Sequence, residues 1–421
     1  MKLAVVGGGS TYTPELLDGL AAMGDRPLFE ELVLHDIDAE RLAVVGGFAE
    51  RILRASGSSA RLRLTSDLEA AVDGATAVLL QLRVGGQAAR ASDESFPLAC
   101  DCLGQETTGA GGLAKALRTV PVVRGIAEVV RARALPDAWI VDFTNPVGIV
   151  TRALLEDGHR AVGLCNVAIG FQRMFAGWLA CEPDRVALDH IGLNHLTWIR
   201  SVTVDGQERM PQVLAEHGDE LAERLEMPRA LVDAVGAIPS YYLRYFYQHD
   251  EVVRELQASG TRASEVMAIE ADLLAMYADP QLTEKPALLE QRGGAFYSQA
   301  AVALVESLLG QPGARPRHVV NVRNGSTMPF LPADAVIEVP ADVDAEGIHV
   351  LPVADVAANL RGLISHVSAY EELALKAAIH GGRDRVLAAM LAHPLIGQYD
   401  RAERLTDDLL AANRAHLPWI S

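Results

Sequence analysis

Short apolar runs alternate with longer amphipathic stretches through the first 165 residues. The runs are too short for buried helices, and glycine or polar residues close them, so they predict buried strands. They lie at Lys2–Val6, Glu31–Leu34, Arg61–Leu64, Ala77–Leu82, Trp139–Phe143 and Ala161–Leu164. Helical periodicity fills several intervals, at 39–55, 113–134 and 146–156. This alternation predicts a parallel, doubly wound sheet, so the chain begins with a Rossmann-like α/β fold.

The pattern changes after about His190. The later segments predict a strand at 195–204, helices such as 240–258, strands at 318–322 and 335–339, and a mostly helical end at 353–414. We therefore expect two domains: a Rossmann-like NAD-binding domain at 1–190, and an α+β domain at 191–421 for substrate binding and oligomerisation.

Composition and charge narrow the class of protein. Half of the 421 residues are hydrophobic, and the net charge is -18, so neither a nucleic-acid nor a membrane partner is expected. No apolar stretch reaches the length of a membrane span, and the first strand runs directly into a glycine turn. We therefore expect a cytoplasmic enzyme. The four cysteines are too few for a disulfide scaffold: Cys100, Cys102, Cys165 and Cys181.

A glycine turn follows the first strand and precedes a helix start at Thr13-Pro14. Gly7 and Gly9 would let the backbone approach a pyrophosphate, although Tyr12 stands where a third glycine is usual. Asp36 ends the second strand, where a carboxylate favours the ribose of NAD over that of its phosphorylated form. A purely structural tight turn is the alternative. The predicted cofactor contacts in this region are Gly7, Gly9, Ser10, Thr11, Tyr12 and Asp36.

Cys165 and His195 occupy matching settings, since each closes an apolar strand shortly after a Gly-Leu pair. A thiolate and an imidazole suit zinc or a transition metal, and two ligands would leave open positions for substrate oxygens and water. The alternatives are a small buried hydrophobe and a packing histidine.

Two further groups of residues carry possible chemistry. The aromatic segment 241–247 would place Tyr242 and Tyr245 on one helix face, and a tyrosine beside a metal or an arginine can serve as a base. An ordinary amphipathic core helix is the alternative. Arg90 and Arg262 could clamp an anionic substrate group, although surface ion pairs would also explain them.

Six motifs in order make the chain similar to a known family. They are Val6-Gly7-Gly8-Gly9-Ser10 with Tyr12-Thr13-Pro14-Glu15, Gly104-Gln105-Glu106-Thr107-Thr108-Gly109, Phe143-Thr144-Asn145-Pro146, Gly163-Leu164-Cys165-Asn166, Gly192-Leu193-Asn194-His195, and Tyr242-Leu243-Arg244-Tyr245. Over essentially its whole length the chain resembles glycoside hydrolase family 4, the NAD- and metal-dependent 6-phospho-glycosidases and their relatives.

The resemblance implies hydrolysis by an unusual route. In the family, NAD oxidises C3 of the sugar, a tyrosine removes the C2 proton, the glycosidic oxygen leaves C1, water adds, and C3 is reduced again. By resemblance, the metal, usually manganese, would bind Cys165 and His195, with Tyr242 as the base. The remaining implied contacts are Asn145 to nicotinamide and sugar, Asn166 to sugar hydroxyls, and Arg90 and Arg262 to the 6-phosphate, with Ser10 nearby.

Two positions favour a 6-phospho-β-glucosidase within the family. Asn166 after the metal cysteine is typical of the phospho-sugar branch, and Ala237 stands where α-acting members carry an acid. The expected substrates are a phosphorylated disaccharide or an aryl glucoside, and the expected assembly is a homodimer or homotetramer. Val84 and Ser240-Tyr241 depart from the family pattern near the site, which bears on specificity.

Three alternatives stay open from the sequence. The first is a family member acting on an α-linked or non-phosphorylated glycoside. The second is a lactate- or malate-type dehydrogenase, which would accumulate NADH. The third is a regulator that binds NAD and phospho-sugars without turnover.

Overall fold

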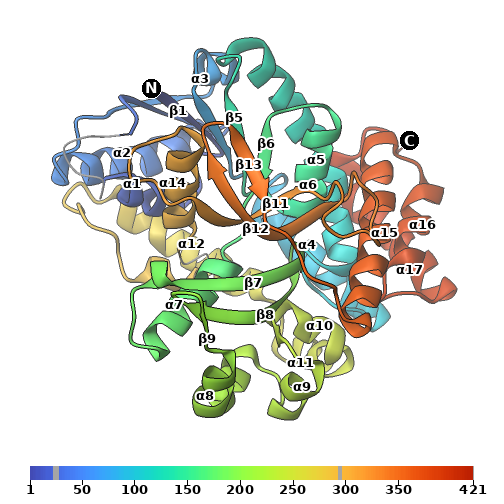
Figure 1. Ribbon diagram of the computed structural model, residues 1–421. Helices are drawn as coiled ribbons and strands as arrows, with labels where there is room; N and C mark the ends of the chain where they lie inside the picture. Colours follow the sequence, from blue (N-terminus) through green and yellow to red (C-terminus); the bar gives the residue numbers. More distant parts are fainter. Residues whose placement is uncertain (22–27, 293–295, 421) are drawn as a thin grey trace.

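The computed structural model describes residues 1–21, 28–292 and 296–420, and a nine-stranded sheet forms its centre (Figure 1). The strand order is β13-β12-β11-β6-β5-β4-β1-β2-β3. The first six strands are β1 (Lys2–Val6), β2 (Glu31–His35), β3 (Arg61–Thr65), β4 (Ala77–Leu80), β5 (Trp139–Asp142) and β6 (Ala161–Gly163). All of them pair in parallel. Their order, 3-2-1-4-5-6, is that of the Rossmann fold, so the predicted fold class is confirmed.

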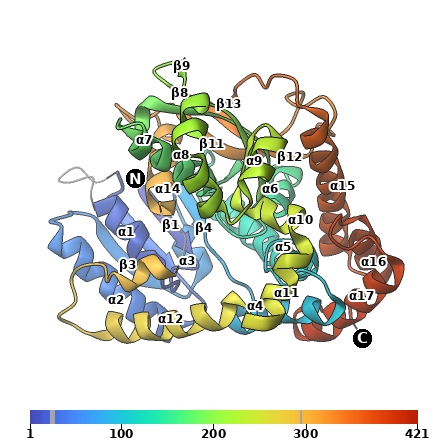
Figure 2. The same ribbon diagram turned by 90° about the horizontal axis from the view of Figure 1, so that it is seen from below.

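Helices cover both faces of this sheet (Figures 1 and 2). One layer holds α1 (Thr13–Ala21), α2 (Ala39–Ala55), α12 (Arg262–Ala278) and α14 (Tyr297–Leu308), with α1 against α2 and α14, and α2 against α12. The other holds α5 (Gly109–Arg133), α6 (Val147–Glu156) and α15 (Ala358–His380), which contact one another. The central strands β4 and β5 are buried throughout, which accounts for their continuous apolar sequence.

Three strands from the second half of the chain extend the first sheet. They are β11 (Arg317–Arg323), β12 (Val336–Asp344) and β13 (Gly347–Val350), and β11 runs antiparallel to β6. Asn321 pairs with Gly163 there, and a Cβ on that glycine would lie 2.3 Å from Thr151 Oγ1. The sheet is continuous across the two halves of the chain, so a boundary at residue 190 does not separate two independent sheets. The division into two domains at that residue stays a prediction.

A second, antiparallel sheet holds β7 (Val186–Leu193), β8 (Leu196–Val204), β9 (Gln207–Glu208) and β10 (Ile238–Pro239). The prediction of one helix at 240–258 is wrong. Ile238–Pro239 pairs with β8 and the Ser240 amide donates to the Thr197 carbonyl, so the chain is still extended at Ser240. A short 3-10 turn (Tyr241–Leu243) and α10 (Arg244–Tyr247) follow, and the non-helical backbone of Gln248 separates them from α11 (His249–Ser259).

The remaining helices surround these two sheets. They are α3 (Leu68–Val72), α4 (Gly86–Ser95), α7 (Val167–Trp178), α8 (Met210–Leu225), α9 (Arg229–Val235), α13 (Leu288–Gln291), α16 (Arg383–Ala392) and α17 (Tyr399–Asn413). None of the helices in the described ranges combines the length and apolar composition that a membrane crossing requires.

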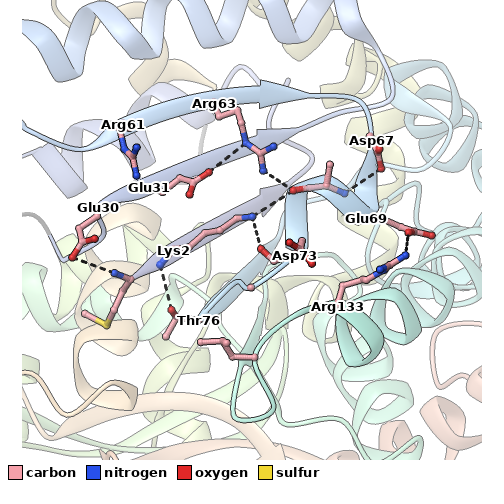
Figure 3. Close-up of a pocket in the computed structure, with 14 residues that line it drawn as sticks. Lys2, Glu30, Glu31, Arg61, Arg63, Asp67, Glu69, Asp73, Thr76 and Arg133 are labelled. Atoms are coloured by element: carbon pink, nitrogen blue, oxygen red, sulfur yellow. Dashed lines mark hydrogen bonds and ion pairs between the residues drawn. The ribbon is translucent and has the colours of Figure 1, made fainter.

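A groove of about 980 Å³ lies at the amino ends of β1, β2 and β3, opposite the glycine turn. Ion pairs and hydrogen bonds span it (Figure 3): Lys2 Nζ donates to the Asp73 carbonyl at 2.6 Å, and Arg63 pairs with Glu31 at 3.3 Å. Since its basic and acidic side chains neutralise one another, this groove carries no net attraction for an ion of either sign.

Candidate active site

A cleft of about 900 Å³ opens at the carboxyl ends of the parallel strands, where doubly wound sheets bind ligands. The predicted site residues that line it are Gly7, Ser10, Tyr12, Asp36, Arg90, Asn145 and Tyr242. They come from the glycine turn, from the end of β2, from α4, and from the segments after β5 and β10. The fold therefore brings together segments far apart in sequence.

Hydrogen bonds hold the glycine turn against the end of β2. Gly7 has φ 92°, and its N–H donates to the His35 carbonyl at 2.9 Å. The Gly9 N–H donates to Asp36 Oδ2 at 2.9 Å, which ties the turn to the predicted ribose ligand. Thr11 differs from its prediction: it is fully buried behind the turn, where its hydroxyl donates to Glu270 at 3.2 Å.

Gly7→Ala should weaken NAD binding by at least about tenfold, equivalent to about 1.4 kcal/mol. Alanine disfavours a positive φ, and its Cβ would lie 2.6 Å from the Gln81 carbonyl oxygen, so the turn would have to move. Isothermal titration with NAD would measure the change. Gly57→Ala is the matched control, because Gly57 also has positive φ but an added Cβ there meets open space. Equal NAD affinity in both variants would contradict the role of the turn.

Cys165 follows β6 and is 4% exposed. Burial and the nearby Glu338 carboxylate raise the pKa of its thiol. Hydrogen bonds from the Val167 amide, the Tyr297 hydroxyl and the Asn194 side chain act in the opposite direction, so the sulfur already lies among donors that stabilise a thiolate.

His195 lies in the tight turn between β7 and β8, with φ 62°. Burial lowers its pKa to about 4, so the ring is neutral and can ligate a metal. Thr107 Oγ1 lies 2.9 Å from Nδ1, which leaves Nε2 as the second ring nitrogen. The ring stacks on Tyr242, with centroids 3.6 Å apart and an interplanar angle of 8°.

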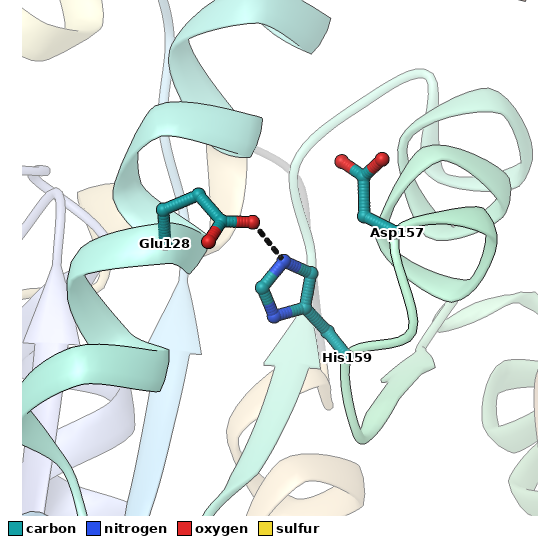
Figure 4. Close-up of side chains that lie close together, drawn as sticks. All are labelled: Glu128, Asp157 and His159. Carbon is teal, nitrogen blue, oxygen red and sulfur yellow. Dashed lines mark ion pairs between the residues drawn. The ribbon is translucent and has the colours of Figure 1, made fainter.

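The donors of Cys165 and His195 fit a divalent transition metal. Within the described ranges, the one group of three clustered His, Cys, Asp or Glu ligand atoms lies elsewhere, at Glu128, Asp157 and His159 (Figure 4). Two arginines already occupy that group: Arg124 donates twice to Asp157, and Arg131 lies 3.0 Å from His159 Nε2. The Cys165–His195 pair is therefore the better candidate.

The pKa of the Tyr242 hydroxyl differs from what the sequence led us to expect. Burial and the charges of Cys165 and Glu106 raise its pKa, so the surrounding side chains do not produce the lowered pKa of a poised base. A cation bound at Cys165 and His195 would act in the opposite direction. Tyr242 and Tyr245 do contact each other, as expected, with ring centroids 6.0 Å apart.

A buried carboxylate organises the cations on one side of the cleft. Glu106 receives Lys115 at 2.6 Å, Arg90 at 3.4 Å and a short contact from Arg83. Burial opposes ionisation of Glu106, but these three charges outweigh it and hold the pKa of Glu106 well below its usual value. Arg90 also pairs with the buried Glu94 at 2.7 Å, so these three cations meet two carboxylates and this side of the cleft keeps one positive charge in excess, within a strongly acidic protein.

Cys165 and His195 do not line the cleft themselves, and neither do the predicted substrate contacts Asn166 and Arg262. Asn166 is the N-cap residue of α7 directly after Cys165, and Arg262 begins α12 at the surface. Arg262 pairs with Glu265 and donates to the Gln291 carbonyl at 2.6 Å. Its predicted contact with a 6-phosphate stays a prediction.

Sequence reasoning missed several residues that line the cleft, among them Arg292, Tyr297 and His416. Arg292 pairs with Glu270 at 2.9 Å, and Tyr297 contacts both Cys165 and the ring of Tyr12. His416 comes from the C-terminal end. Nothing in the local sequence of any of these residues differs from that of a surface arginine, a core tyrosine or a terminal histidine.

Comparison with known proteins covers nearly the whole chain. Residues 2–180 match the family 4 glycosyl hydrolase domain, and residues 190–396 match the family 4 glycosyl hydrolase C-terminal domain. A probable 6-phospho-beta-glucosidase of Bacillus subtilis is 37% identical, with 99% of this chain and 97% of that protein covered.

Two solved structures share the fold closely. The 6-phospho-beta glucosidase of Thermotoga maritima, with manganese, NAD+ and glucose-6-phosphate, is 34% identical, with a TM-score of 0.92 and 99% of each chain covered. A 6-phospho-alpha-glucosidase from gut microorganisms, in complex with NAD and glucose-6-phosphate, is 27% identical, with a TM-score of 0.91 and 99% and 98% covered. Because both domains of the family are matched, over residues 2–180 and 190–396, this chain belongs to glycosyl hydrolase family 4.

Proposed function

We propose that the protein hydrolyses 6-phospho-β-glucosides with NAD and a divalent metal. One observation carries this proposal: the glycine turn and Tyr242 line a single cleft, and Tyr242 stacks on His195 and lies within electrostatic reach of Cys165. The relatives named as 6-phospho-beta-glucosidases, and the structure that holds manganese, NAD+ and glucose-6-phosphate, support it.

The cofactor would lie along the glycine turn and Asp36. When bound, NAD supplies the hydride acceptor that is regenerated within each cycle. Asn145 lines the same cleft, and its Oδ1 is buried without a hydrogen-bond partner among the described residues. A buried oxygen of this kind is free to accept a hydrogen bond from a ligand, which supports contact with the nicotinamide amide or a sugar hydroxyl.

Cys165 and His195 would hold the metal, which supplies Lewis-acid stabilisation of charge on sugar oxygens. Tyr242 is the group that we assign to remove the proton from C2. Its ring is fixed by stacking on His195 and by edge contacts with Tyr241 and Tyr245, so its hydroxyl is held at one place in the cleft.

A phosphate would bind on the basic side of the cleft. Arg83, Arg90 and Arg292 all line it, and each guanidinium is oriented by a buried carboxylate. Planar guanidinium groups recognise phosphate through paired hydrogen bonds. Arg90 is the predicted ligand that the geometry supports, and Arg292 adds one that the sequence did not indicate.

Ala237 supports the β-linkage. Its methyl group is buried just before β10 and cannot donate a proton to a leaving group. Action on an α-linked or non-phosphorylated glycoside is the second candidate, because a 6-phospho-alpha-glucosidase structure also matches over the full chain.

The decisive assay is hydrolysis of p-nitrophenyl-β-glucoside 6-phosphate after metal and nucleotide have been removed. We expect activity only when NAD and Mn²⁺ are added together. Co²⁺ and Ni²⁺ should also restore it better than Mg²⁺ or Ca²⁺, because thiolate and imidazole ligands favour transition metals over hard cations. Full activity with Mg²⁺ alone would contradict metal binding by Cys165.

Parallel assays separate the other candidates. Faster turnover of the α-linked or the unphosphorylated nitrophenyl glucoside would show that this glucoside represents the true substrate class. Stoichiometric accumulation of NADH would indicate a dehydrogenase, and tight binding without turnover would indicate a regulator.

We further propose that the protein is a homodimer or homotetramer in the cytoplasm. The resemblance to the family supports the assembly, and four cysteines without disulfides support the location. Light scattering after gel filtration would test the assembly.

A further inference from the structure

A buried carboxylate lies where the two sheets meet, within electrostatic reach of Cys165 and His195. Glu338, on β12, is 1% exposed. It accepts hydrogen bonds from Asn194 Nδ2 and Asn321 Nδ2, each at 3.0 Å, and lies 3.0 Å from His190 Nε2. Burial opposes its ionisation, but these hydrogen bonds and the nearby histidine lower its pKa below the usual value, so the group carries a buried negative charge.

Asn194 connects this carboxylate to the site. Its side chain donates to Glu338 and also forms a hydrogen bond with Cys165, and its backbone immediately precedes His195. Because an amide group is planar, fixing one contact to Glu338 fixes the direction in which the other meets the sulfur. The orientation of Asn194, and the turn that carries His195, thus depend on Glu338.

The charge of Glu338 also reaches the site. Its carboxylate acts electrostatically on Cys165, His195 and Tyr242. A structural hydrogen-bond acceptor at this place would not need a charge, and a buried charge is costly unless it is compensated. His190 lies against the carboxylate at 3.0 Å, and a cation held by Cys165 and His195 would add to that compensation.

We propose that Glu338 is a positioning residue of the metal site, which orients Asn194 toward Cys165 and raises the affinity of the Cys165–His195 pair for a divalent cation. This inference rests on the proposed function, in which that pair holds the metal. Side chains behind the metal ligands commonly set affinity in this way.

The test measures the affinity of the full-length protein for Mn²⁺ at saturating NAD. The electron paramagnetic resonance signal of the free ion reports how much Mn²⁺ stays unbound. Glu338→Gln should raise the Kd for Mn²⁺ by about 10- to 100-fold. Asn321→Ala is the matched control, since it removes another hydrogen bond from the same carboxylate without touching Asn194; its Kd should stay within about threefold of the parent value. NAD affinity should be unchanged in both.

Cys165→Ser, measured alongside, distinguishes the two levels of inference. If it loses Mn²⁺ while Glu338→Gln binds normally, the role of Glu338 is overturned and the metal site stands. If Cys165→Ser binds Mn²⁺ like the parent, both the proposed metal site and the role of Glu338 are overturned. Should Glu338→Gln not fold, Asn194→Ala tests the same connection, and an unchanged Kd in that variant overturns the proposal. Weakening of equal size in Asn321→Ala would reduce Glu338 to a structural role and also overturn it.

Discussion

Cys165→Ser should lower kcat for the 6-phospho-β-glucoside by at least about 10³-fold, because several kcal/mol of charge stabilisation by the metal is lost and each 1.36 kcal/mol is tenfold in rate. Serine has the shape of cysteine and is only slightly smaller, so packing at this buried position is largely preserved. Its hydroxyl, however, does not ionise near neutral pH and cannot replace a thiolate ligand. NAD affinity should change little, because the glycine turn and Asp36 form a separate part of the site.

The measurement is steady-state turnover over a range of Mn²⁺ concentrations, with NAD binding determined by titration. Cys181→Ser is the matched control: Cys181 is also a free cysteine, but it is half-buried and lies beyond the end of α7, outside the motifs that carry Cys165 and His195. It should retain the parent activity. Normal turnover of Cys165→Ser with trace metal removed would show that the metal assignment is wrong.

The local part of this site could be predicted from the sequence because parallel strands bring their carboxyl ends to one edge. Gly7, Asp36 and Asn145 each follow such a strand, and Cys165 follows β6 in the same sheet. Knowing that the sheet is parallel places them at one edge, and the strand order β6-β5-β4-β1-β2 then brings them near one another.

The rest depends on contacts that local pattern does not encode. Arg292 lines the cleft and Arg262 lies at the surface. Nothing in the sequence separates them, because Arg292 precedes one ordinary helix and Arg262 begins another. Strands β11 to β13 have the alternation of any antiparallel strand, and only the pairing of Asn321 with Gly163 joins them to the first sheet. Glu338 looks like a solvent-facing residue of a strand, yet packing between two sheets buries it.

The break in the predicted helix at 240–258 has a similar origin and a functional consequence. Pairing of Ile238–Pro239 with β8 keeps the chain extended up to Ser240. Tyr242 therefore lies in a 3-10 turn one residue later, against the His195 turn of the same sheet, and not in the middle of a regular helix. Tertiary pairing of two residues thus overrides a strong helical pattern and sets the place of the proposed base.

Tyr242→Phe should lower kcat by about 10²- to 10⁴-fold, the usual contribution of a general base, with a much smaller change in KM. Phenylalanine keeps the ring that stacks on His195 and meets Tyr241 and Tyr245, so the site should keep its shape. Only the hydroxyl is lost. In the parent protein, NAD-dependent turnover in D₂O should place deuterium at C2 of the product, and the variant should slow this incorporation in proportion to kcat.

Tyr245→Phe is the matched control, because Tyr245 belongs to the same aromatic cluster but does not line the cleft. It should turn over at close to the parent rate and incorporate deuterium normally. If Tyr242→Phe lost kcat while C2 exchange continued at the parent rate, proton removal would belong to another group and Tyr242 would act later in the cycle. Since the side chains around Tyr242 raise its pKa, C2 exchange should also require the metal, and exchange that persists after metal removal would show that no bound cation is needed to activate the phenol.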